Sequence, residues 1–585
     1  MNHKFAIMTV LISLGIFTGH VDCHWDLTIP MGYAEDANLT HLIVRTLLET
    51  GWIFENPKLG APYSLMLFDY PGTDLLHLLM AHGLSLISND SAVVMNLIYL
   101  LTFILNPLAF YYVMTHLKVR PALAMMLALV FNYAPYHFIK GPTAPFLSAY
   151  FVIPLTTLLF LALWSDRLPF FKALGEGQHR FQLWSKASFG WFGVCFLTGA
   201  SGVYYAFYSV IFILASTVFR QIRGFQPAAL ISGILATGVV SATTVAQVVP
   251  SFIYKYFHGP NLEVAQRTIH DTEIYSLRMA QLLVPHPGGL LSFDWLDSLY
   301  QKFWQSGILI NENISSSLGI IGSLGFLLLM VTLIKRVKHP VLDQLSLLSL
   351  TALLFASVSG GATLFTIYVT PQMRSNARIS IFITMFALTG LGLWLEFMLR
   401  KSHHPRWKVA ALVLMGALGI MTQLPREVTY RESSFLLDRA FVRSIEAIVP
   451  EEAMIFQLPY QPFPESPPQF DHKDYDHARL YFHSDHLRWS YGAMKGRDDL
   501  WQRDLIREPA ATMVHQLRAL GFRGLVIDRF GYENRGQDIL EEVAGSQVSR
   551  YFMSHDQRYV FFEIPQKSLK NQVKTNEQAA WQHRF

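Results

Sequence analysis

The 585-residue sequence contains little charge and only two cysteines. Asp, Glu, Lys and Arg make up 15% of the chain, whereas a soluble protein of this size carries about 25%. This shortage disfavours a soluble fold, and no run of basic and aromatic residues indicates nucleic-acid binding. Cys195 lies within one apolar stretch and Cys23 near the end of another, so we expect no disulfide, and their spacing fits no zinc site. Cysteine usage therefore does not identify the redox compartment.

Several catalytic motifs are also missing. The sequence has no Gly-rich phosphate loop, no Gly-x-Ser-x-Gly nucleophile elbow and no His-Glu-x-x-His zinc motif. It also lacks an internal repeat of fixed period. Any chemistry must therefore be sought in less regular groups of polar residues.

Long apolar stretches are what the sequence has in abundance. About 20 apolar residues cross the hydrocarbon core of a bilayer, and the chain has about eleven candidate membrane spans. Gly199 to Gly202 interrupt one apolar stretch and predict a tight hairpin, whereas 75–86 is too short to cross and is expected to lie against the membrane. We expect the first span to be uncleaved, with a cleaved signal peptide as the alternative. The predicted spans are 4–20, 92–115, 121–138, 144–164, 186–200, 203–219, 227–249, 315–334, 342–358, 377–398 and 408–424.

Basic residues are concentrated in alternate connections between these spans. Lys118 and Arg120 lie in one such connection, Arg220 and Arg223 in another, and further basic residues occur near 335–338, 400–408 and 167–186. The positive-inside rule assigns these connections to the cytoplasm. The N-terminus is then cytoplasmic, and the C-terminal part lies outside.

Three predicted outer segments are long: 21–91, 250–314 and 425–585. Outer loops of this length are usually functional or form domains. In the last segment, strands at 453–458, 524–527 and 559–564 alternate with helices at 509–520 and 538–544, which indicates a small α/β domain. The fold class is therefore a polytopic α-helical membrane protein with about eleven transmembrane helices and a C-terminal extracytoplasmic α/β domain. We expect a transmembrane domain at 1–424, the α/β domain at 425–565 and a disordered tail at 566–585.

An acidic pair, Glu35 and Asp36, follows the first predicted span. Adjacent carboxylates just outside the membrane are candidates for a general base or for ligands of a divalent cation. The alternative is a pair of ordinary solvated acidic residues.

Basic residues also occur where the charge rule does not expect them. Arg374 and Arg378 are four residues apart at the outer end of a predicted span, so we expect them to share one helical face. Arg favours phosphate because its planar guanidinium offers paired donors. Lys140, which follows His137, also lies at an outer end and indicates an anionic partner. Snorkelling toward lipid head groups is the alternative for these cations.

Two further segments contain polar clusters. Asp271 and Glu273 begin a predicted amphipathic helix on the membrane surface, where Asp271 is also a candidate helix cap. The segment 474–491 combines histidines with carboxylates, but its spacings match no compact set of metal ligands. We interpret 474–491 as an ordinary polar surface.

The acidic pair, the many spans and the C-terminal outer domain together resemble the GT-C superfamily of polyprenyl-phosphate-dependent glycosyltransferases. The chain is similar to large bacterial multi-pass membrane proteins of that kind in the segments 49–52, 55–62, 135–138, 273–277 and 374–380. This resemblance implies a bacterial inner (cytoplasmic) membrane protein with its C-terminal domain in the periplasm. It also implies a polyprenyl-phosphate sugar donor and an acceptor glycan, lipid or protein, with membrane lipids as the remaining partners.

The resemblance implies a role for each candidate residue. Asp36, or else Glu35, would be the general base that deprotonates the acceptor hydroxyl. Arg374 and Arg378 would bind the lipid phosphate and stabilise its developing charge. Metal dependence stays open, with a divalent cation such as Mg²⁺ or Mn²⁺ as the candidate cofactor. Residues that would help to position donor or acceptor are His137, Lys140, Glu273 and Asp271.

Two other functions remain as alternatives. A transporter or flippase for a lipid-linked saccharide would have polar residues at mid-membrane, whereas the ionisable residues here gather at one side. A non-catalytic protein of envelope glycan assembly would use the C-terminal domain for docking and would not need Asp36.

Overall fold

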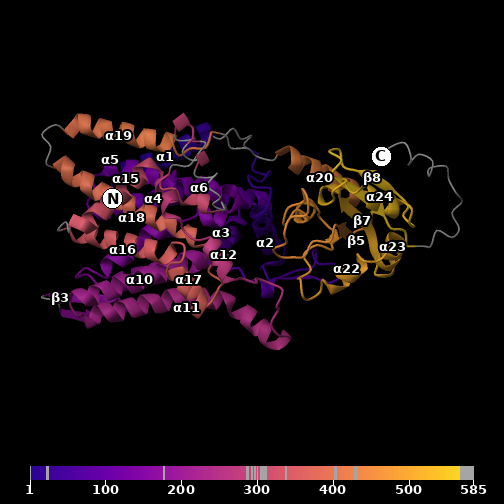
Figure 1. The fold of residues 1–585 in the computed structure, drawn as a ribbon, viewed down its shortest axis with the longest axis horizontal. Coiled ribbons are helices and arrows are strands. Elements are labelled where there is room, and N and C mark those ends of the chain that lie inside the picture. The colour runs from indigo at the N-terminus through magenta and orange to yellow at the C-terminus, as the bar shows by residue number, and fades with distance from the viewer. Residues whose placement is uncertain are drawn as a thin grey trace.

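The computed structural model of this protein describes residues 2–20, 26–175, 178–284, 289–291, 294–295, 298, 301–302, 312–335, 339–400, 405–426 and 432–566. Two parts follow each other along the longest axis of the molecule: a helical bundle and a C-terminal part that contains a sheet (Figure 1). Residues 21–25, which include Cys23, and most of the outer segment 285–311 lie outside the described residues.

The bundle is built from apolar helices that pack through small residues. In the contact between the helices 319–335 and 380–400, a Cβ on Gly325 would lie 2.3 Å from the carbonyl oxygen of Ala387. Such close approach of helix backbones is typical of helix packing in membranes. The bundle helices are α1 His3–His20, α4 Ser91–His116, α5 Pro121–Asn132, α6 Pro135–Lys140, α7 Pro145–Ser148, α8 Val152–Ala162, α9 Lys186–Ala200, α10 Val203–Arg223, α11 Pro227–His258, α15 Gly319–Lys335, α16 Pro340–Ala356, α18 Ser380–Arg400 and α19 Pro405–Met421.

Five helices of the described chain are long and apolar enough to cross a membrane, or up to six if the bent pair α15 and α16 forms one span. The protein is thus a multi-pass membrane protein by the length and composition of its helices. The predicted count of about eleven spans remains a prediction. The predicted span 121–138 corresponds to one candidate span, Pro121–Thr143, in which a new helix begins at Pro135. The predicted span 144–164 is divided into α7 and α8, with a break between Ser148 and Val152.

The sequence correctly predicts a helix at the first apolar stretch and a break after Ala200, whereas the assignment of α1 as a membrane span stays a prediction. α1 packs against the bundle through one face, where Phe17 contacts Phe103 with 4.2 Å between ring centroids and the Ser13 hydroxyl donates to the Phe103 carbonyl at 2.7 Å. The apolar stretch after Lys186 divides between Ala200 and Val203 into α9 and α10, as predicted.

Short elements connect the bundle with the C-terminal part. Those before α11 are α2 Asp36–Thr50, β1 Glu55–Asn56, β2 Leu65–Met66, η1 Leu67–Asp69, α3 Leu75–Leu84 and η2 Gly141–Thr143. Those after α11 are α12 Ile269–Ile274, α13 Met279–Leu283, η3 Glu312–Ser316, α17 Gly361–Tyr368 and η4 Asn376–Ile379. A separate hairpin, β3 Phe171–Gly175 and β4 Gln178–Phe181, lies at the opposite end of the bundle (Figure 1). The contacts below concern mainly α2, η3 and η4.

The C-terminal part contains a five-stranded sheet in the order β6-β5-β7-β9-β8. β5 is parallel to β6 and β7, whereas β9 is antiparallel to β7 and β8. The strands and helices predicted from the sequence occur within two residues of their predicted ends. The elements are α20 Glu432–Glu446, β5 Met454–Leu458, α21 Ala478–Tyr481, β6 Arg488–Trp489, α22 Leu500–Leu505, α23 Ala510–Ala519, β7 Phe522–Asp528, η5 Arg529–Gly531, α24 Gln537–Ala544, β8 Tyr551–Met553 and β9 Tyr559–Glu563.

The interpretation of 474–491 as ordinary polar surface was wrong. Asp476, His477 and Arg479 are all buried, with at most 3% of each residue exposed. The charges are tolerated inside because they are paired: Arg558 contacts Asp528 at 2.7 Å and Asp476 at 2.8 Å. The described residues hold no group of three or more His, Cys, Asp or Glu side chains that would bind a metal ion.

Candidate functional site

The acidic pair lies at the start of α2, where the helical bundle meets the C-terminal part. Asp36 is the first residue of α2, and Glu35 precedes it with a φ of 51°, a backbone region that non-glycine residues rarely adopt. Glu35 Oε1 lies 3.1 Å from Lys473 Nζ of the C-terminal part. Within the described ranges, no cation lies within 4 Å of the Asp36 carboxylate and no side-chain hydrogen bond holds it.

Lys140, Glu312 and Arg378 form a group that we call the bundle cluster. Glu312 Oε2 lies 2.5 Å from Lys140 Nζ and 2.9 Å from Arg378 Nη2. The Arg378 guanidinium also lies over the Tyr204 ring, 4.3 Å from its centroid. Two cations share one carboxylate, so the cluster keeps a formal charge of +1 (two positive charges less one). Lys140 is 6% exposed, which excludes snorkelling into lipid head groups for this residue.

The Asp36 carboxyl group lies within electrostatic range of the bundle cluster. Asp36 is exposed at the protein surface, yet the density of protein around its carboxyl group desolvates it and raises its pKa. Arg378 and Lys140 act in the opposite direction, and Glu312 adds to the rise. For Glu312, burial favours the neutral form, but Arg378 and Lys140 outweigh it and hold the pKa well below its usual value. Asp36 is therefore the more basic of these two carboxylates.

Arg267, Arg374 and Glu465 form a second group, the boundary cluster. Glu465 accepts a hydrogen bond from Arg267 and one from the Tyr70 hydroxyl at 3.2 Å, and its Oε1 lies 3.8 Å from Arg374 Nη2. This cluster also contains two cations and one carboxylate and keeps a formal charge of +1. Tyr70 lies within electrostatic range of both Glu465 and Asp36, so this cluster, like the bundle cluster, lies near Asp36.

The expectation that Arg374 and Arg378 share a helical face was wrong. Residues 376–379 form the 3-10 turn η4, α18 begins only at Ser380, and Arg374 precedes both elements. The two guanidinium groups consequently turn to different carboxylates, Glu312 for Arg378 and Glu465 for Arg374. Arg374 also lies over the Tyr275 ring, 5.0 Å from its centroid.

The remaining predicted residues make contacts within the scaffold. His137 is buried, stacks on Phe103 and shares hydrogen bonds with Thr102 Oγ1 at 2.8 Å and the Asn132 carbonyl at 2.6 Å. Asp271 accepts from the Thr268 backbone N–H at 2.8 Å in a capping box of α12. Their predicted roles in substrate binding stay predictions.

Glu273 is also engaged by the scaffold. Its carboxylate accepts from the Ser359 backbone N–H at 2.9 Å and from the Thr363 hydroxyl near the start of α17. A carboxylate in this position stabilises a helix N-terminus. Its predicted role in substrate binding likewise stays a prediction.

Sequence reasoning missed Glu312 and Glu465, and it assigned Asp474 to an ordinary polar surface. The only signal for Glu312 was the unexplained cation Lys140, which called for an anionic partner without identifying it. Glu465 and Asp474 lie in the C-terminal part, more than 400 residues from Asp36 in the chain, and no local pattern connects them.

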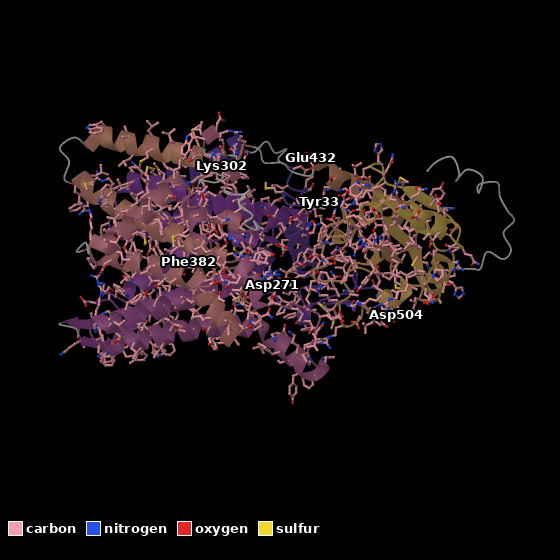
Figure 2. All side chains as sticks on the ribbon, in the orientation of Figure 1. Tyr33, Asp271, Lys302, Phe382, Glu432 and Asp504 are labelled. Carbon is pink, nitrogen blue, oxygen red and sulfur yellow. The ribbon has the colours of Figure 1, made fainter. Side chains whose placement is uncertain are left out.

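The C-terminal part holds the segment that carries Asp36. Tyr33 is 3% exposed, and its hydroxyl donates to Asp438 Oδ2 at 2.6 Å and lies 3.0 Å from His483 Nε2. Figure 2 shows Tyr33 between the bundle and the C-terminal part. Further along α2, Arg45 Nη2 donates to the Ser484 carbonyl at 2.5 Å. These buried contacts fix α2 against the C-terminal part.

No residue set in the described ranges defines a metal site, because no three potential ligands converge. The possible Mg²⁺ or Mn²⁺ cofactor therefore stays open. The arrangement offers instead a free carboxylate beside two groups of cations, which suits removal of a proton next to an anionic leaving group.

No family model and no curated protein matches this chain. Among solved structures, it is similar to the oligosaccharyltransferase of Archaeoglobus fulgidus in its apo form, with 11% identity, a TM-score of 0.45, and coverage of 98% of this chain and 75% of that one. The complex of that archaeal enzyme, AglB, with an inhibitory peptide and a dolichol-phosphate gives 11% identity and a TM-score of 0.44 over the same shares. The arabinofuranosyltransferase AftD from Mycobacteria gives 10% identity and a TM-score of 0.41, covering 96% of this chain and 41% of that one.

These solved proteins are oligosaccharyltransferases and an arabinofuranosyltransferase. Their identities and TM-scores are too low to assign an activity to this chain. The function proposed below rests on the chain's own residues.

Proposed function

We propose that this protein is a membrane glycosyltransferase that transfers a sugar from a polyprenyl-phosphate-linked donor to an acceptor glycan, lipid or protein. The reaction would occur at the extracytoplasmic face, which the charge distribution of the predicted loops assigns to this end of the bundle. The observation that carries the proposal is the free Asp36 carboxylate within electrostatic range of Arg378 and Lys140.

In this reaction, Asp36 accepts the proton of the acceptor hydroxyl. The hydroxyl oxygen forms a bond to the anomeric carbon of the donor sugar, and the bond from that carbon to the phosphate oxygen breaks. The leaving polyprenyl phosphate keeps the electron pair of the broken bond. Charge on the phosphate is stabilised by the bundle cluster, whose two cations exceed its one carboxylate.

The raised pKa of Asp36 agrees with the role of a base. A carboxylate with a higher pKa binds a proton more strongly, so desolvation improves its ability to deprotonate a hydroxyl group. Glu35 forms an ion pair with Lys473 at 3.1 Å, and this pairing engages the carboxylate that would otherwise accept a proton. Asp36 is therefore our choice of base.

Replacement of Asp36 by Asn tests the proposal. The substitution keeps the size of the side chain and removes the base, and general-base catalysis contributes about 10²–10⁴-fold to a rate. We expect a deletion strain that expresses Asp36→Asn to show the same loss of surface glycan as the deletion strain itself. The matched control is Asp504→Asn, because the Asp504 side chain is 81% exposed and remote in sequence from the site.

A folded, membrane-inserted Asp36→Asn protein that restores the glycan fully would refute the catalytic role. The alternative of a non-catalytic assembly protein predicts that result. A reporter fused to the C-terminus that proves to be cytoplasmic would also overturn the proposed face of the reaction.

A further inference from the structure

Asp474 of the C-terminal part lies close to Asp36, in a segment whose position is fixed. Its neighbour Lys473 contacts Glu35 at 3.1 Å, and the backbone carbonyl of Tyr475 accepts a hydrogen bond from Asn38 at 3.5 Å. On the other side, buried His472 is held by Asp528 at 2.8 Å. Asp474 is therefore set against the first turn of α2.

The Asp474 carboxylate has no cationic partner within 4 Å in the described part of the chain. It accepts a hydrogen bond from the backbone N–H group of Tyr475 at 3.0 Å. The side chain is half-buried, and desolvation together with the nearby Asp36 and Glu465 raises the pKa of Asp474 to about 7.

The other carboxylates at this boundary are paired. Glu35 contacts Lys473, Glu312 contacts two cations of the bundle cluster, and Glu465 contacts Arg267. Even the nearby Lys495 donates to the Glu465 carbonyl oxygen at 3.0 Å and not to Asp474. Two neighbouring carboxyl groups without an ion pair destabilise the folded protein when both are ionised, and such perturbed groups are typical of functional sites.

The chemistry of the pair restricts what binds between Asp36 and Asp474. A phosphate would be repelled by the carboxylates and attracted to the two cationic clusters. A divalent cation would find only two carboxylates, and the described residues supply no third ligand. A neutral group with hydroxyls fits, because carboxyl groups accept hydrogen bonds from hydroxyls and, when protonated, also donate them.

We propose that Asp474 is an acceptor-binding residue that hydrogen-bonds a saccharide acceptor and directs its attacking hydroxyl toward Asp36. This inference rests on the glycosyl transfer proposed above. The proton of the attacking hydroxyl still passes to Asp36, while Asp474 binds a neighbouring hydroxyl and takes no part in bond breaking. The C-terminal part thereby contributes directly to acceptor recognition.

Binding of methyl glycosides to the full-length protein in nanodiscs tests this role. The methyl glycosides of glucose, galactose, mannose, N-acetylglucosamine and arabinose serve as probes of the acceptor site. Undecaprenyl phosphate, which carries no sugar, serves as the probe of the lipid-phosphate site. We expect the wild type to bind at least one glycoside and Asp474→Asn to bind it at least tenfold more weakly, with undecaprenyl phosphate affinity within twofold of wild type. Asp471→Asn is the control, because Asp471 is exposed and pairs with Arg535 in the same segment.

The pH dependence separates this role from a structural one. Charged or titratable groups that face Asp474 are Asp36 on α2 and Glu465, Tyr475, Tyr491 and Lys495 in the C-terminal part. We expect wild-type glycoside affinity to change with a midpoint near pH 7, where Asp474 titrates, and Asp474→Asn to lack this midpoint. A structural defect would weaken binding equally at every pH.

Three results would overturn the inference: no glycoside bound by the wild type, equal binding by Asp474→Asn, or binding that requires a divalent cation. Failure of the proposed function is distinguishable, because it would appear as wild-type protein that does not bind undecaprenyl phosphate. Glycoside binding at Asp474 would survive that result. Asp36→Asn is expected to keep glycoside binding and to lose only transfer.

Discussion

Replacement of Glu312 by Gln tests the bundle cluster most directly. Glu312 is the shared partner of two cations, at 2.5 Å from Lys140 and 2.9 Å from Arg378, and at most 19% of any of these three side chains is exposed. The substitution preserves the shape of the side chain and removes its charge. It thus leaves both cations without an anionic partner in a poorly solvated site.

The expected loss of stability follows from that burial. Removing one partner of a buried ion pair costs about 3–5 kcal/mol, because the remaining charge is left uncompensated. An unfolding entropy of about 2.1 cal/mol/K per residue gives about 1.2 kcal/mol/K for the 585 residues if they unfold as one unit. The Tm of Glu312→Gln should therefore fall by about 2–4 °C.

The same substitution should strengthen phosphate binding. The formal charge of the cluster rises from +1 to +2 when Glu312 becomes neutral, so an anionic head group is attracted more strongly. We expect affinity for undecaprenyl phosphate to rise about tenfold, equivalent to about 1.4 kcal/mol. Non-specific damage to the fold would lower stability and affinity together, whereas this cluster predicts that they change in opposite directions.

Thermal unfolding by intrinsic fluorescence and binding of undecaprenyl phosphate in nanodiscs measure the two effects. Glu263→Gln is the matched control, since Glu263 pairs with Arg503 at a 43% exposed position, where an ion pair contributes about 0–1 kcal/mol. A Glu312→Gln protein with wild-type Tm and wild-type affinity would refute the assignment of this cluster as a phosphate site held by Glu312.

Two further substitutions test buried contacts of the C-terminal part, one with the segment before α2 and one within the part itself. Tyr33→Phe removes the hydrogen bond to buried Asp438, so the free energy of unfolding in a denaturant titration should fall by about 1–3 kcal/mol. An unchanged midpoint would contradict the buried contact. Asp528→Asn leaves His472 and Arg558 without their shared carboxylate, so the folding stability of the C-terminal part should fall by about 3–5 kcal/mol. Proteolysis of the C-terminal part should then become faster. Resistance equal to that of the wild type would contradict this prediction.

Local patterns in the sequence predicted local structure well. The break at Gly199 to Gly202 separates α9 from α10, and the strands and helices of the C-terminal part lie within two residues of their predicted ends. These features depend on glycine, hydrophobic periodicity and residues that lie close together in the chain. The division of the predicted span 144–164 into α7 and α8 was missed, because no glycine or proline marks the break between Ser148 and Val152.

The pairing of charges was not predictable in the same way. Lys140 and Glu312 are 172 positions apart, and Arg378 is a further 66 positions along the chain. Their contact depends on how the outer segment before α15 packs over the bundle, which no short pattern specifies. The prediction that Arg374 and Arg378 share a helical face, made from their spacing of four residues, was wrong because the chain adopts a 3-10 turn there and α18 starts later.

Contact with the C-terminal part separates cationic groups from unpaired carboxyl groups at the boundary, and this separation orients the donor and the acceptor of the proposed reaction. Each cationic cluster has an excess of one positive charge, whereas Asp36 and Asp474 are carboxyl groups that no cation of the described residues contacts within 4 Å. A donor phosphate is therefore attracted to the clusters, and a neutral hydroxyl is the group that approaches the carboxyl pair. In an inverting transfer, base and leaving phosphate must lie on opposite sides of the anomeric carbon. Because Asp474 belongs to the C-terminal part, separating that part from α2 should weaken acceptor binding first and leave phosphate binding at Arg378 intact.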